Sequence, residues 1–132
     1  MKDVFEIAYR YVMPAIRGLV VREIHKYGIR ESIIANILGI SRSAVTRYIM
    51  GERGGYINLV KFNEVIPMIR ELSKNIIEKQ LMPQEIHLMM FKIAAHLMSR
   101  KKLCGLHKRI DQSIDIVKCE ICPTIFKEIT PS

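Results

Sequence analysis

Apolar residues recur at intervals of three and four along most of the chain, and alternating apolar and polar residues are rare. Intervals close to 3.6 residues are typical of amphipathic α-helices, whereas alternation is typical of strands. The clearest example runs from Pro14 to about Tyr27, where Gly28 supplies a C-terminal stop. The stretch from Val4 to Val12 fits either a short helix or a strand. We therefore expect a mostly α fold.

Further helices are predicted on both sides of a glycine-rich break at residues 51–55. Two short helices, 31–38 and 42–50, precede the break. A helical region is expected from about Leu59 to Lys79, with Pro67 starting its second part, and another helix from Pro83 to about Leu103. From Cys104 onward the periodicity is weak. This pattern divides the chain into segments 1–58, 59–103 and 104–132.

Residues 31–50 meet the steric requirements of two short helices that cross at a tight turn. Ala35 is small where the helices approach each other, and Gly39 allows the positive φ angle that the turn needs. Ser41 can cap the second helix by accepting a hydrogen bond from a free backbone N–H. This segment therefore predicts a helix-turn-helix. The apolar positions that must point into the core are Ile34, Leu38, Ile40, Val45 and Ile49.

The second helix of this pair has one apolar face and one polar face. Val45, Tyr48 and Ile49 lie at i, i+3 and i+4 and share the apolar face. In a helix-turn-helix the polar residues near the N-terminus of this helix enter the major groove. An arginine there can form two hydrogen bonds with a guanine. The alternative is that the polar face contacts only solvent. The candidate DNA-binding residues are Ser41, Arg42, Ser43, Thr46, Arg47 and Arg53.

The same stretch resembles the Cro/C1-type (lambda-repressor-like) helix-turn-helix. The residues that carry the resemblance are Ala35, Leu38-Gly39-Ile40-Ser41, Ala44-Val45-Thr46, Tyr48, Gly51 and Arg53. With residues 11–17 before it and Gly54 after it, the stretch is similar to a group of predicted archaeal transcriptional regulators. The resemblance implies sequence-specific binding to double-stranded DNA, usually as a homodimer on an inverted repeat. It does not imply a base preference, because Arg42 and Arg47 stand where glutamine is commoner in that group.

The net positive charge of the chain favours an anionic partner but does not identify that partner. The 132 residues carry a net charge of +8, which favours nucleic acid. No apolar run approaches the roughly 20 residues that cross a bilayer, so we expect no membrane partner. The N-terminus lacks the layout of a signal peptide, and we expect a cytoplasmic protein.

The C-terminal segment contains a second motif, which consists of Cys104, His107, Cys119 and Cys122. Each pair is separated by two residues, so that both members can turn toward one cation, and two pairs complete a tetrahedron. All three cysteines of the chain belong to this motif. The resembling archaeal regulators have a similar Cys-x-x-His…Cys-x-x-Cys tail. We therefore predict a metal site in the segment 104–132.

The donor set leaves the identity and role of the metal open. Three thiolates and one imidazole suit zinc or an iron–sulfur cluster. Four protein ligands leave no open position, which favours a structural zinc over a catalytic one. An iron–sulfur cluster would make the tail a redox or iron sensor. The alternative without metal is three buried cysteines and an unrelated histidine.

Other functions have weaker support in the sequence. An RNA-binding or ribosome-associated protein would favour aromatic stacking platforms, but the chain has no Trp and its four Phe are scattered. An enzyme is not expected, because we find no nucleophile–base pair and no phosphate loop. Whether an effector ligand exists stays open. Methionines at 82, 89, 90 and 98 indicate core packing or, within segment 59–103, a dimer interface. The basic residues at 100–102, 108 and 109 either contact DNA phosphates or complement a helix dipole.

Overall fold

The computed structural model describes residues 3–113, 115 and 118–126, and this part of the chain is mostly helical, with no β-strand. The predicted mostly α class is therefore confirmed. The elements in chain order are α1 (Val4–Ile7), η1 (Ala8–Val12), α2 (Met13–Lys26), α3 (Glu31–Leu38), α4 (Arg42–Ile49), η2 (Leu59–Lys61), α5 (Val65–Lys79), α6 (Pro83–Ser99), α7 (Cys104–Ile110) and α8 (Ile121–Phe126).

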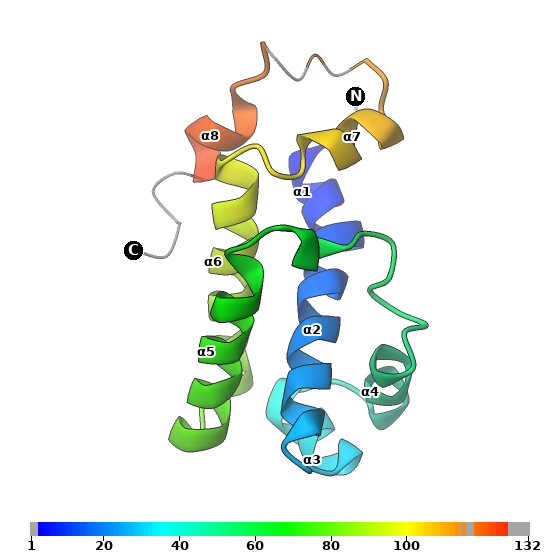
Figure 1. Ribbon diagram of the computed structural model, residues 1–132, viewed down its shortest axis with the longest axis vertical. Helices are drawn as coiled ribbons and strands as arrows, with labels where there is room; N and C mark the ends of the chain where they lie inside the picture. The colour runs from blue at the N-terminus through cyan, green and yellow to red at the C-terminus, as the bar shows by residue number, and fades with distance from the viewer. Residues whose placement is uncertain (1–2, 114, 116–117, 127–132) are drawn as a thin grey trace.

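The segment from Val4 to Val12 is helical and leads directly into α2 (Figure 1). This decides between the helix and the strand that its sequence allows. Asp3 caps its start, since its side chain accepts a hydrogen bond from the backbone N–H of Phe5 at 2.7 Å. The turns at η1 are widened, and the N–H of Met13 donates to the carbonyl of Ala8, five residues earlier. Pro14 explains the widening, because its ring lacks an N–H and would clash with a carbonyl of a regular preceding turn.

The two motifs found in the sequence lie at opposite ends of the molecule (Figure 1). Helices α3 and α4 pack at the C-terminal end of α2, whereas α7 and α8 lie near α1 and the end of α6. The 23 residues from Val4 to Lys26 span about 34 Å as a helix. A ligand in one motif therefore has no direct contact with a ligand in the other.

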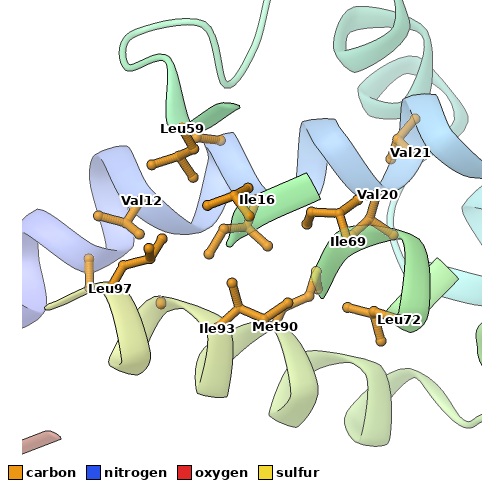
Figure 2. Packing of buried hydrophobic residues seen from close by; sticks show 14 of the residues in the cluster. Val12, Ile16, Val20, Val21, Leu59, Ile69, Leu72, Met90, Ile93 and Leu97 are labelled. Carbon is orange, nitrogen blue, oxygen red and sulfur yellow. The ribbon is translucent and has the colours of Figure 1, made fainter. Parts of the chain in front are cut away.

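Helix α2 forms the centre of the core, between α4 on one side and α5 and α6 on the other. Ile16 and Val20 of α2 face Met90 and Ile93 of α6, with Ile69 of α5 beside them (Figure 2). All five side chains are buried. This apolar contact between three helices contributes to the hydrophobic stabilisation of the core.

Two predicted boundaries differ from the observed ones, and the tail is more helical than its periodicity indicates. The helix expected from about Leu59 begins only at Val65, after the short 3₁₀ turn η2 and a break at 62–64, so Pro67 lies within its first turn. Helix α6 ends at Ser99 and not near Leu103, because Lys101 adopts a left-handed conformation with φ of 59°. The weakly periodic tail contains two short helices, α7 and α8.

One hydrophobic cluster includes residues from all three segments into which the sequence divides the chain. Phe126 of α8 is buried, and its ring meets Phe5 at 5.9 Å and Phe91 at 6.4 Å, both edge to face. The described part of the tail thus packs against the start and the middle of the chain. Within the described residues, no helix combines the length and the apolar character needed to cross a membrane.

Candidate nucleic-acid interface and metal centre

The turn between α3 and α4 has the geometry that the sequence predicts. Gly39 ends α3 with φ of 66°, and the N–H of Ile40 donates to the carbonyl of Ala35 at 3.1 Å. The side chain of Ser41 caps α4 by accepting from the N–H of Ala44 at 3.1 Å. The predicted bounds 31–38 and 42–50 agree with the observed helices to within one residue. Gly39 therefore sets the end of α3 and Ser41 sets the start of α4.

Helix α4 turns one face inward and one face outward. Ala44, Val45 and Tyr48 are buried, whereas Arg42 and Arg47 are exposed. Neither guanidinium has a hydrogen bond or ion pair with a residue that the structure describes. Two positive charges on the outer face of α4 are therefore available to an external partner.

Two residues expected in the core are only half-buried. Ile40 and Ile49 pack against the core cluster but keep part of their side chains in solvent. Ile40 lies in the turn and Ile49 at the last position of α4, where no further helical turn covers them. Both lie at the margin of the core and not in its centre.

The hydroxyl groups among the predicted contact residues already have partners in the protein. Thr46 donates to a carboxylate oxygen of Glu31 at 2.5 Å, which joins α4 to the first turn of α3. The hydroxyls of Ser41 and Ser43 lie 3.2 Å apart and share a hydrogen bond. Donation from the Thr46 hydroxyl to a phosphate or a base would require it to leave Glu31. The arginines are therefore the better candidates for base contact.

Three arginines surround Tyr48, and two of them were not singled out from the sequence. Arg17 donates to the Tyr48 hydroxyl at 3.1 Å, and Arg22 donates to the Tyr48 carbonyl at 2.8 Å. The guanidinium of Arg53 lies 5.9 Å from the centre of the Tyr48 ring. Arg17 and Arg22 lie on α2, far from the motif in sequence, so the local pattern around Tyr48 carries no signal of them. They add positive charge at the C-terminal end of α4.

The second motif is brought together by α7, α8 and the residues before α8. Cys104 and His107 lie on α7 and are buried, and Cys122 is buried on α8. These three line one small cavity of about 10 Å³, together with Ile7 and Met98. Such a volume is close to that of one water-sized sphere.

The cysteine thiols influence one another's ionisation. The pKa of Cys122 is raised from 9.0 to about 11, mainly by burial and then by negative charge on Cys104 and Cys119. The pKa of Cys104 is also raised, by burial first, although nearby Lys101 opposes the change. Because charge on Cys119 acts on both of the other thiols, all three sulfur atoms lie in one neighbourhood. In the metal-free state Cys104 and Cys122 are therefore neutral thiols at pH 7.

The donor chemistry fits one cation, but the ligands are not assembled around one point. No group of three or more His, Cys, Asp or Glu side chains in the described residues is arranged to hold a metal ion. The shared cavity and the mutual effect on pKa place the predicted ligands Cys104, His107, Cys119 and Cys122 within the same small region. Binding would require them to draw closer together.

The basic residues at 100–102, 108 and 109 lie at this end of the molecule and not beside α4 (Figure 1). They follow α6, whose first residue Pro83 contacts the turn at Gly39. The length of α6 therefore separates them from α3, α4 and the turn between these helices. Lys101 lies 3.9 Å from Glu120 and so links the end of α6 to the residue before α8.

Comparison with known proteins gives no relative. No protein-family model matches the chain, and neither a curated protein nor a solved structure matches it.

Proposed function

We propose that this protein is a DNA-binding transcriptional regulator that inserts α4 into the major groove. The observation that carries the proposal is the outer face of α4, where Arg42 and Arg47 are exposed and have no partner among the described residues. Their guanidinium groups can each form two hydrogen bonds with a guanine. The preceding turn at Gly39 and the cap at Ser41 are features that a helix-turn-helix requires.

The positive charge around Tyr48 supports the same function. Arg17 and Arg22 donate to Tyr48, Arg53 lies over its ring, and the three add positive charge near the end of α4 that attracts the phosphate backbone. The resemblance to the Cro/C1-type motif adds a homodimer that reads two half-sites about 34 Å apart. A regulator of this kind acts on the chromosome, and we place it in the cytoplasm.

The test begins with selection of bound sequences from a random double-stranded library, since the operator is unknown. Fluorescence anisotropy then compares the selected duplex with a scrambled one for the parent protein, Arg42→Ala and Arg47→Ala. Each variant is expected to weaken binding by about 1–3 kcal/mol, because each loses a base contact. Arg70→Ala on the exposed face of α5 is the matched control and should bind as the parent does.

Two outcomes would contradict the DNA-binding proposal. One is that both variants bind the selected duplex with the affinity of the parent. The other is that binding does not weaken as salt increases, since phosphate contacts release counterions. Preferential binding of single-stranded RNA over any duplex would favour the RNA-binding alternative.

We further propose that Cys104, His107, Cys119 and Cys122 bind one zinc ion in a structural role. The support is the Cys₃His donor set, the small cavity that three of the four line, and the burial of those three. Zinc held by four protein ligands would supply stability to the tail and would leave no position for a substrate. An iron–sulfur cluster is the second candidate, because the same thiolates suit iron.

Anaerobic purification followed by absorption spectroscopy and measurement of zinc, iron and sulfide per chain separates the two candidates. A colourless protein with one zinc per chain supports the structural role. A brown protein with iron and sulfide identifies a cluster, and DNA affinity would then be compared between its oxidised and reduced states. Cys119→Ser is expected to lower the bound metal and the Tm, and full metal content in that variant would contradict the site.

A further inference from the structure

A second concave region lies between the segment that leaves the helix-turn-helix and the start of the tail. It is a cavity of about 480 Å³ between residues 55–62 on one side and residues 102–109 on the other. This volume falls within the range of about 300–1,000 Å³ that is typical of small-molecule sites. Neither the recognition surface of α4 nor the cysteine motif uses this cavity.

The charged residues of the cavity are all of one sign. Lys61, Lys102 and Arg109 line it, and none of the described residues lining it is acidic. None of the three has an ion pair with a described residue. A concave surface with three cations concentrates positive potential and so attracts an anion. Phosphate, which carries more than one charge, suits three cations better than a single carboxylate does.

Two of these cations lie close to one aromatic ring. The ammonium group of Lys61 lies 5.2 Å from the centre of the Phe62 ring, and that of Lys102 lies 5.9 Å from it. Both distances allow a cation–π interaction. Both ammonium groups thus lie beside the same ring, and an anion bound in the cavity would offset their charge.

The rest of the lining is apolar or aromatic and suits an uncharged ligand body. Leu59, Leu103 and Leu106 are buried beneath the cavity. The ring of Tyr56 is held against Tyr11 with their centres 4.7 Å apart, and Asn58 adds an amide with a donor and an acceptor. A phosphate joined to a flat, partly polar ring matches this lining.

We propose that this cavity binds a nucleoside phosphate, with the phosphates on Lys61, Lys102 and Arg109 and the base over the apolar floor. The site would connect the chain leaving α4 to the helix that carries Cys104 and His107. Binding is independent of the proposed DNA recognition, whereas any effect of the nucleotide on DNA affinity rests on it.

Isothermal titration of the full-length, metal-loaded protein with ADP, adenosine and pyrophosphate tests the proposal. ADP is expected to bind saturably and more tightly than either fragment. Lys61→Ala and Lys102→Ala should each weaken ADP binding by about tenfold or more, because each removes a charge-assisted hydrogen bond. Lys79→Ala, at the last residue of α5, is the matched control and should leave ADP binding unchanged.

Gly105→Leu tests the cavity without changing its charge. A Cβ atom at Gly105 would meet no atom within 4 Å, so the larger side chain can enter the cavity without displacing the backbone. This variant is expected to lose ADP binding. Circular dichroism checks that it is folded. If it does not fold, the Lys61→Ala and Lys102→Ala variants test the proposal.

Several results would overturn the proposal. They are the absence of saturable ADP binding, ADP binding unaffected by all three variants, and pyrophosphate binding as tight as ADP. A loss of duplex affinity in Lys61→Ala and Lys102→Ala without any nucleotide present would instead make the region part of the DNA contact.

Discussion

The ionisation of the Cys122 thiol depends on whether the tail is folded and whether it holds a metal. It is buried, and its pKa is raised from 9.0 to about 11 in the folded protein, mainly by that burial. Without metal the neutral thiol is favoured by folding. With metal the thiolate would be the bound form, and protons would compete with the metal for it.

Metal-free and metal-loaded protein are therefore expected to lose stability at opposite ends of the pH range. In the metal-free protein the contribution of Cys122 is fully present below pH 9 and is lost as pH rises from about 9 through about 11. The full loss should be about 3 kcal/mol, two pKa units at about 1.4 kcal/mol each, of which about 2 kcal/mol is reached at pH 11. Urea unfolding at pH 8 and pH 11 measures it.

Cys122→Ala separates this effect from the titration of other groups, because it removes only the thiol at that position. The expected result is a smaller difference between the two pH values in the variant than in the parent. An equal difference would mean that Cys122 does not ionise differently in the folded state. The metal-loaded protein should be the less stable at acidic pH.

At the level of elements, the chain after α4 is held against α2 by a close backbone contact. Gly54 has φ of 74°, and a Cβ atom there would lie 2.4 Å from the carbonyl oxygen of Pro14. Gly51, three residues earlier, has φ of 77° but no atom within 4 Å of such a Cβ. The two glycines share the backbone conformation and differ in the space around them.

This contrast predicts different costs for the same substitution. Gly51→Ala should lower the free energy of unfolding by about 1 kcal/mol, because alanine is strained at positive φ. Gly54→Ala should cost at least about 2 kcal/mol, because the contact with Pro14 must also be broken. Urea denaturation of both variants measures the difference, and equal values would mean that the loop after α4 does not depend on this contact.

At the level of the whole molecule, the described part of the tail belongs to the core. Phe126 is only 1% exposed and meets Phe5 from the first helix and Phe91 from α6. Three parts of the chain that are distant in sequence therefore share one aromatic contact. The tail stabilises the bundle through this contact.

Phe126→Ala should destabilise the whole protein by about 3 kcal/mol, since it removes a buried aromatic ring and leaves a cavity. Thermal unfolding should remain one transition with a lower Tm, because the ring packs against the first helix and α6. Ile125→Ala is the neighbouring control, since that side chain is 42% exposed and should cost much less. A similar loss of stability in both variants would show that Phe126 is not part of the core in solution.

Local features of the chain were sufficient to predict helices α3 and α4 and the turn between them. The spacing of Ile34, Leu38 and Val45, the glycine in the turn and the serine cap act over a few residues, so the sequence alone located both helices. The same is true of the long helix that starts near Pro14 and stops at Gly28. These signals are local because helix ends depend on hydrogen bonds between near neighbours.

Contacts between distant parts of the chain were decided by the tertiary structure. Arg17 and Arg22 reach Tyr48 across 31 and 26 residues, and the cavity beside Phe62 joins segments some 40 residues apart. The break before α5 and the packing of α8 on α6 depend in the same way on partners that no local pattern reveals. Periodicity determines which face of a helix is apolar, but only packing determines what covers that face and which charges meet beside it.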